Sequence, residues 1–242
     1  MSKRRLNSIS QGEIDRWITA PRFRAFLDAA DDDRTQAMAL YDWNICMSAV
    51  FFEILGYTEV TLRNAIDAQF APVQHHQPAL ESWLCDPALM TPKSLEKVHD
   101  AIAGIERVKK EPTRARVVAN LSFGFWRALL DRHYKQLWID RLHRAFPNGT
   151  GDRKEVATLL ARLNPFRNRL AHHEPVIDVP ISKRHDELIE LARLIDGDAA
   201  RWLIARSSVL EILDWKPPLN RTKRLRASLG LTPRTVRFHL HL

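Results

Sequence analysis

Two arginines, two asparagines and two histidines occur within the segment NPFRNRLAHHEP, which runs from Asn164 to Pro175. Their side chains are suited to the cleavage of a phosphodiester. Histidine has an unperturbed pKa of about 6.5, which allows proton transfer at neutral pH. Arginine presents a planar fork of donors to phosphate oxygens and does not lose its charge. We therefore take His172 as the acid or base, Arg167 as the phosphate clamp and Asn168 as the residue that orients the imidazole or holds a phosphate oxygen.

The same segment carries the signals of a short helix. Asn164 can cap a helix, and Pro165 suits the first helical position, where no backbone donor is needed. Pro175 disfavours a helical conformation at the residue before it, so we expect the helix to end near His173. His173 and Glu174 are expected to cap and anchor that end.

On such a helix the polar residues gather away from the apolar ones. Phe166 and Leu170 share one side, while Asn168 and His172 lie one turn apart on another, with Arg169 beside His172. One face would then pack into a core and the other would present the polar groups. An alternative is a buried polar network that holds a helical bundle together, in which the histidine is satisfied by a backbone carbonyl.

The rest of the chain must fold into helices around this segment. Eight glycines in 242 residues argue against a turn-rich all-β protein, and a hydrophobic content of 45% is ample for a core. We predict an all-α, multi-helix bundle. Helices are expected over residues 11–19, 22–30, 34–55 (ended by a glycine at position 56), from 59 onward, 92–108, from 113, 152–163, 182–194 and from 198 to 213.

Three regions are predicted: N-terminal helices over residues 1–30, a helical domain over 31–215 and a basic tail over 216–242. The tail contains no acid. A polyanionic partner such as RNA would explain it, because each neutralised phosphate releases a counterion; a solvated tail that aids solubility is the alternative. The tail has seven cationic residues, Lys216, Arg221, Lys223, Arg224, Arg226, Arg234 and Arg237.

Several classes of protein are disfavoured by what the sequence lacks. Cys46 and Cys85 match no metal spacing and no disulfide framework, so we read them as reduced thiols of a cytoplasmic protein. The apolar run over residues 45–55 contains Glu53 and is too short to span a bilayer, so no membrane partner is expected. The chain shows no carboxylate cluster, phosphate-binding glycine loop or Cys/His quartet, so we expect no metal and no cofactor.

Four strings, LYDWN, EVTLRNAI, LSFGFW and RNRLAHHEP, follow one another along the chain. Together they resemble the Abi-like (abortive infection, AbiD/AbiF type) proteins of bacteria, and Arg167 with His172 fits the arginine-to-histidine spacing of the HEPN superfamily. The resemblance covers residues 40–202 and implies a HEPN-type helical fold. It also implies a metal-independent endoribonuclease that acts in phage defence or as a toxin and leaves a 2′,3′-cyclic phosphate.

In HEPN proteins the active site forms where two such helices meet, so the resemblance implies a homodimer with a composite site. It further implies that Glu59, Arg63 and Asn64 line the site around His172, together with Arg169 and His173; the alternative for Glu59 and Arg63 is a salt bridge on a solvated helix. An antitoxin or a phage-derived activator would be a further partner. A non-catalytic RNA-binding module and a structural partner of a defence system are the alternative functions.

The LSFGFW string has two possible roles. Its aromatic side chains could form a platform on which bases stack. We favour a core position for them, with the glycine allowing close approach of a neighbouring helix, because aromatic residues at helical spacing more often pack inside.

Overall fold

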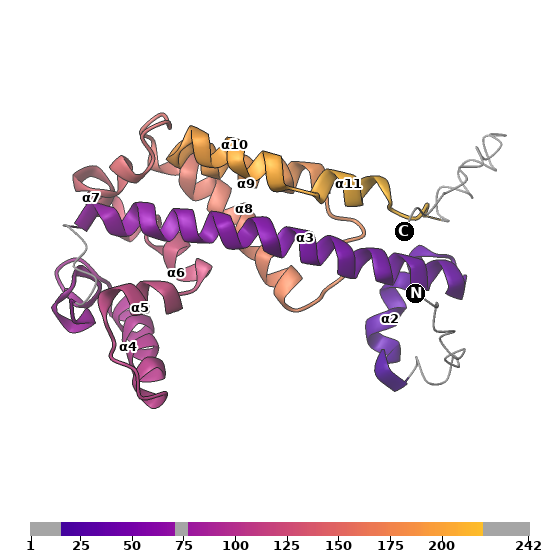
Figure 1. The fold of residues 1–242 in the computed structure, drawn as a ribbon, viewed down its shortest axis with the longest axis horizontal. Coiled ribbons are helices and arrows are strands. Elements are labelled where there is room, and N and C mark those ends of the chain that lie inside the picture. The colour runs from indigo at the N-terminus through magenta and orange to yellow at the C-terminus, as the bar shows by residue number, and fades with distance from the viewer. Residues whose placement is uncertain (1–15, 71–76, 220–242) are drawn as a thin grey trace, which may run out of the picture. The chain divides into compact units, whose positions relative to one another are not determined.

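A computed structural model describes residues 16–70 and 77–219 of the chain (Figure 1). These residues form α-helices and short 3-10 turns, with an isolated bridge between Pro78 and Thr113 and no β-strand. The all-α prediction is thereby confirmed, while the first predicted helix lies mostly outside the described residues. The helices are α2 (Ala20–Ala29), α3 (Arg34–Asp67), α4 (Pro92–Arg107), α5 (Arg114–Asn120), α6 (Phe123–Ala128), α7 (Lys135–Asp140), α8 (Arg153–Ala171), α9 (Ile181–Ile195), α10 (Gly197–Arg206) and α11 (Val209–Asp214).

The longest helix, α3, continues through Gly56, so the predicted end at this glycine is wrong. A glycine inside a helix costs only about 1 kcal/mol. The buried stripe of α3 continues across it from Ile54 to Thr58 and Leu62, each of which is 0% exposed. The hydroxyl of Thr58 also donates a hydrogen bond of 2.8 Å to the Ile54 carbonyl oxygen. Burial on both sides of the glycine therefore outweighs its low helix propensity.

Because α3 is longer than predicted, the sequence argument that its apolar run is too short for a membrane no longer applies. By length and composition alone, the helix from Arg34 to Phe70 could cross a bilayer. A long core helix of a soluble protein passes the same test, and several α3 side chains, among them Leu40, Met47 and Phe51, are fully buried. The cytoplasmic location and the absence of a membrane partner stay predictions.

The break predicted between α9 and the next helix occurs at residue 196, but the segment that follows is two helices. α10 ends at Arg206, and Ser207 has extended backbone angles. The Ser207 hydroxyl accepts a hydrogen bond of 3.3 Å from the Val209 N–H, which begins α11. The side chain of Ser207 thus competes with the helix ladder and ends α10, as serine does at helix caps.

The chain divides into two compact units, of which unit 1 comprises residues 1–47, 175–179 and 211–242. Its core contains Phe23, Phe26 and Leu40, against which Ile177 packs. Two buried hydrogen bonds join its separate segments. The Asn44 amide oxygen accepts from the Val176 N–H at 2.7 Å, and the Trp43 indole donates to the Ile212 carbonyl oxygen at 2.9 Å.

Unit 2 comprises residues 48–174 and 180–210. Within it α8 packs on α9 and α6, α9 packs on α10, and α4 packs on α5 (Figure 1). The aromatic residues of LSFGFW, Phe123, Phe125 and Trp126, are at most 1% exposed, so their predicted core position is confirmed. A methyl group added at Gly124 would lie 3.5 Å from the Asn164 side chain, an ordinary contact, so the approach of α8 does not require glycine there.

A buried ion pair joins the C-terminal end of α3 to α5. Arg114 is 1% exposed, and its Nη2 lies 2.8 Å from the Asp67 carboxylate. The guanidinium also donates to the Asp67 carboxylate through Nε at 2.9 Å and to the Asp67 carbonyl oxygen at 2.8 Å. The Trp83 indole donates to the same carboxylate at 2.7 Å. This network, which the sequence did not reveal, fixes α5 relative to α3, and α6 follows α5 directly.

Candidate functional site

The predicted motif segment forms the last two turns of α8 and is not a separate helix. Asp152 caps α8, because its carboxylate accepts a hydrogen bond of 2.9 Å from the Lys154 N–H. The helix then continues through Asn164 and Pro165, so the predicted cap and helix start at these two residues are wrong.

Pro165 has no N–H to donate to the Ala161 carbonyl, and a proline inside a helix costs about 3 kcal/mol. The buried stripe of α8 continues past it, with Phe166 5% exposed and Leu170 0% exposed. Burial of each such side chain stabilises the folded state by about 1.5–3 kcal/mol. Packing of these residues therefore holds the helix together across the proline.

The end of α8 is a Schellman motif, with His172 as the C-cap. His173 has a φ of 53°, and its N–H donates to the Leu170 carbonyl oxygen at 2.9 Å. The Glu174 N–H donates to the Arg169 carbonyl oxygen at 2.9 Å, which completes the motif. The Glu174 carboxylate lies 3.5 Å from the Arg169 Nε. The prediction that His173 and Glu174 cap and anchor this end is confirmed.

Three polar side chains at this end, Asn168, Arg169 and His172, are exposed, and we call them the imidazole face. The His172 N–H donates to the Asn168 carbonyl oxygen at 2.9 Å, so the two residues lie one turn apart as predicted. The exposure of His172 contradicts the alternative in which it belongs to a buried polar network. Within the described residues, the imidazole face combines a titratable ring, an amide and a guanidinium that reach solvent.

A second group of polar residues, the Glu59 cluster, lies between α3, α6 and α8. It consists of Glu59, Arg63, Arg167 and the backbone N–H of Phe123, which donates to the Glu59 carboxylate. The pKa of Glu59 is raised, because partial burial of its carboxyl disfavours the charged form. The two guanidiniums and the Phe123 N–H act in the opposite direction and lower this pKa in part.

Two of the three α3 residues that the sequence placed near the motif belong to this cluster. Arg63 Nη1 donates to the Ala119 carbonyl oxygen at 3.1 Å, so its guanidinium is held against α5, while its buried Nε has no hydrogen-bond partner among the described residues. The Glu59 carboxyl lies near the guanidiniums of both Arg167 and Arg63. Asn64 is exposed on α3 and is not part of the cluster. The Phe123 N–H was not predicted as part of the site. The one signal for it in the sequence is that Phe123 belongs to the LSFGFW string.

Helix geometry places Arg167 and His172 of one chain on different sides of α8. Five residues of α-helix separate them by about 140° around the axis and about 7.5 Å along it. Arg167 instead lies near Glu59, which neutralises its charge in part. The guanidinium that shares the imidazole face is that of Arg169, which is 45% exposed.

The first cation of the predicted RNA-binding tail is part of unit 1. Lys216 Nζ donates to the Ile177 carbonyl oxygen and lies 5.0 Å from the centroid of the Trp43 ring. Partial burial lowers the pKa of Lys216, and the nearby Asp178 carboxylate offsets this in part. Lys216 therefore contacts residues of unit 1, as a residue that stabilises the fold does. The other six predicted tail residues, Arg221, Lys223, Arg224, Arg226, Arg234 and Arg237, lie outside the described residues.

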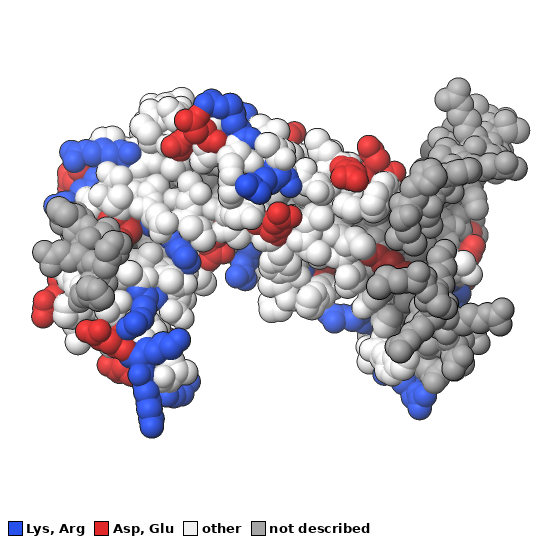
Figure 2. Space-filling model, in the orientation of Figure 1, with Lys and Arg blue, Asp and Glu red and all other residues white. Residues whose placement is uncertain are grey.

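Charged side chains of both signs are interspersed over the described surface that Figure 2 shows. Positive and negative groups alternate there and are separated by uncharged areas. On that face no single-sign field extends across the described residues that would attract a polyanion by itself. Any affinity of that face for RNA therefore depends on local groups of charged side chains.

Comparison with known proteins adds no family to these observations. No family model matches the chain, and neither the curated proteins nor the solved structures include a significant match to it. The likeness to Abi-like proteins and to the HEPN superfamily therefore depends on the four strings in the sequence, and it stays a hypothesis.

Proposed function

We propose that this protein is a metal-independent endoribonuclease of the HEPN and Abi-like class, which cleaves RNA in phage defence or as a toxin. The observation that carries the proposal is the imidazole face. His172 is exposed at the end of α8, one turn after Asn168 and three residues after Arg169. This arrangement supports proton transfer and phosphate binding at one solvent-accessible point.

The reaction requires a base, a cation and an acid. The base takes the proton of the ribose 2′-OH, and the 2′-oxygen forms a bond to phosphorus. The bond from phosphorus to the 5′-oxygen breaks, the acid protonates that oxygen, and a 2′,3′-cyclic phosphate is left. His172 serves as base or acid, Asn168 orients it or holds a phosphate oxygen, and arginine stabilises the charge that develops on the phosphate.

One chain supplies one such imidazole, whereas the reaction uses two proton-transfer groups. A homodimer that pairs two α8 ends would supply both. It would also allow Arg167 of one chain to act on the phosphate held by His172 of the other, a role that helix geometry disfavours within one chain. Sedimentation of the full chain tests this step: a dimer at working concentration is expected, and a monomer that cleaves RNA contradicts it.

Cleavage is tested with the full chain and an end-labelled RNA in the presence of EDTA. The wild-type protein is expected to shorten the RNA, and His172→Ala is expected to lower the rate at least about a hundredfold. His99→Ala, which removes an exposed histidine on α4, is the matched control and is expected to retain the wild-type rate. Equal cleavage by the wild type and His172→Ala would refute the assignment of His172.

A second candidate function is a non-catalytic RNA-binding module, and one observation favours it. Arg167 lies near Glu59, on a different side of α8 from His172, so one chain does not present its phosphate clamp and its imidazole together, as cleavage requires. In the same experiment this function predicts RNA that is retarded but intact with both the wild type and His172→Ala. Neither retardation nor cleavage would indicate a structural partner of a defence system.

A further inference from the structure

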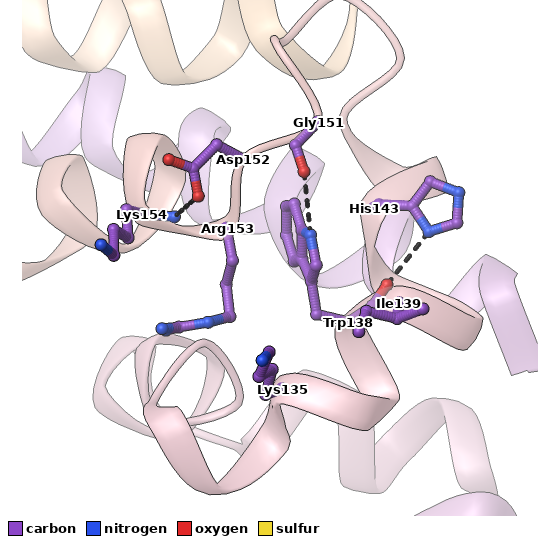
Figure 3. Close-up of a pocket in the computed structure, with 8 residues that line it drawn as sticks. All are labelled: Lys135, Trp138, Ile139, His143, Gly151, Asp152, Arg153 and Lys154. Carbon is purple, nitrogen blue, oxygen red and sulfur yellow. Dashed lines mark hydrogen bonds between the residues drawn. The ribbon is translucent and has the colours of Figure 1, made fainter.

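A pocket of about 370 Å³ lies at the opposite end of α8 from the imidazole face. Its walls come from α7, from the 3-10 turn Leu142–Ala145 and from the first residues of α8 (Figure 3). From Arg153 to Ala171 the helix rises about 27 Å, at 1.5 Å per residue. A molecule in this pocket is therefore far from His172 and is separate from the proposed cleavage site.

The pocket carries more positive than negative charge. Lys135, Arg153 and Lys154 line it, and Asp152 is its one carboxylate. Asp152 is engaged as the N-cap of α8 through the Lys154 N–H. The Arg153 guanidinium donates to the Leu130 carbonyl oxygen, which fixes its position. The ammonium groups of Lys135 and Lys154 form no ion pair with any residue that the structure describes. Two cations are thus available to an anion, and the positive end of the α8 dipole adds to them.

An apolar and aromatic wall faces these cations. The Trp138 indole is 5% exposed, and its Nε1 donates to the Gly151 carbonyl oxygen at 3.0 Å, which fixes the ring. Ile139 is 52% exposed at the same pocket. Figure 3 shows Lys135 and Arg153 on one side of the indole and His143 on the other. The pocket therefore offers cations to one end of a ligand and apolar surface to its body.

His143 adds a specific polar group. Its Nδ1 lies 3.0 Å from the Trp138 carbonyl oxygen, which can only accept, so Nδ1 carries the proton. In the neutral ring Nε2 is then an acceptor. A ligand body that carries an N–H or O–H donor would satisfy it.

We propose that this pocket binds one nucleoside monophosphate unit, either as a free nucleotide or as one unit of an RNA strand. The phosphate contacts Lys135 and Lys154, the base or ribose covers the Trp138 and Ile139 wall, and a donor on the ligand reaches His143. The volume is at the lower end of the range of small-ligand pockets, about 300–1,000 Å³, which suits a mononucleotide. Inorganic phosphate alone would leave the apolar wall uncovered and is expected to bind more weakly.

The test measures binding, so it does not depend on cleavage. The full chain carrying His172→Ala is titrated with labelled 5′-AMP and, separately, with a labelled 12-nucleotide RNA. In this background Lys135→Gln/Lys154→Gln removes the two pocket cations. Lys93→Gln/Lys110→Gln removes two exposed lysines elsewhere in unit 2 and is the control with the same change of charge. Because all four lysines are exposed, thermal unfolding is expected to be unchanged in both variants.

If the ligand is a free nucleotide, 5′-AMP binds and the pocket variant weakens it at least about tenfold, as the loss of two charge-assisted hydrogen bonds implies. If the ligand is a unit of the strand, 5′-AMP binds weakly or not at all, and the pocket variant weakens the RNA about tenfold relative to the control. Equal affinities of the pocket variant and the control variant for both ligands would overturn the proposal, whatever the outcome of the cleavage test.

Discussion

Arg114→Met removes a buried guanidinium and keeps most of the side-chain volume. The Asp67 carboxylate, in a residue that is 6% exposed, then loses the ion pair at 2.8 Å and the Nε bond at 2.9 Å, and among the described residues it keeps the Trp83 indole as its donor. The Asp67 carbonyl oxygen loses its bond to Nη2 as well. Removing one partner of a buried pair leaves an uncompensated charge and costs about 3–5 kcal/mol. We expect the free energy of unfolding to fall by that amount.

The assay is urea unfolding of the full chain, followed by circular dichroism. Arg127→Met is the matched control, because it removes one partner of the ion pair with Asp131, whose side chains are 32% and 47% exposed and lie 3.3 Å apart. Such an exposed pair contributes about 0.2–1 kcal/mol. If Arg114→Met costs no more than Arg127→Met, the Asp67 network does not stabilise the fold as described.

A double variant separates the ion pair from the loss of packing. Asp67→Asn retains an acceptor for the Trp83 indole and removes the charge. In combination with Arg114→Met it is expected to be less destabilising than the sum of the two single variants by about 1–3 kcal/mol, because residues in one buried network are coupled. Strict additivity would show that the cost of Arg114→Met comes from packing alone.

Three further predictions concern His173, His185 and Glu59. His173→Gly is expected to raise the free energy of unfolding by about 0.5–1 kcal/mol, because glycine adopts a positive φ without strain; urea unfolding measures it. Burial lowers the pKa of His185 from 6.5 despite the nearby Asp186 carboxylate, so its contribution to stability is complete above pH 6.5 and falls as the pH drops below it; unfolding at pH 7.5 and 5 measures the loss. Glu59→Gln is expected to free Arg167 for RNA, which raises affinity and steepens the dependence of log K on log salt by about 0.7.

Each of these three has its own contrary outcome. Unfolding of His173→Gly at a lower urea concentration than the wild type would mean that the His173 side chain stabilises the helix end. For His185, the comparison is His185→Gln: a loss of stability between pH 7.5 and 5 as large in this variant as in the wild type would show that His185 does not cause the loss. For Glu59→Gln, an unchanged salt dependence would show that Arg167 does not contact the RNA when Glu59 is neutral.

Local signals in the sequence located helix ends where a side chain forms a cap. A helix was predicted to begin at residue 92, and the Thr91 hydroxyl before it accepts a hydrogen bond of 3.3 Å from the Ser94 N–H at the start of α4. Gly56 and Pro165 were predicted to be boundaries and are helix interiors instead. Their local preferences are worth about 1 and about 3 kcal/mol, and burial of neighbouring side chains on α3 and α8 exceeds them.

The sequence predicted the part of the candidate site that depends on local helical spacing, and it did not predict the part that depends on long-range packing. Helical spacing on one segment placed Asn168, Arg169 and His172 together, because all three lie on the same turns. That spacing could not show that Arg167 lies near Glu59, which is more than a hundred residues away and was connected to the motif only by the resemblance of EVTLRNAI. The pocket near Lys135 was missed, because its cations are spread along the chain and belong to no known motif.

The hydrogen bond that Pro165 cannot make has a consequence for amide exchange. The ladder of α8 lacks a donor at this position, so the last two turns can open as a small unit while the first three turns stay protected. Amides 166–172 are then expected to exchange with solvent deuterium through local opening, and amides 157–164 only through wider unfolding. The segment that carries His172 would be the shorter-lived part of an otherwise continuous helix.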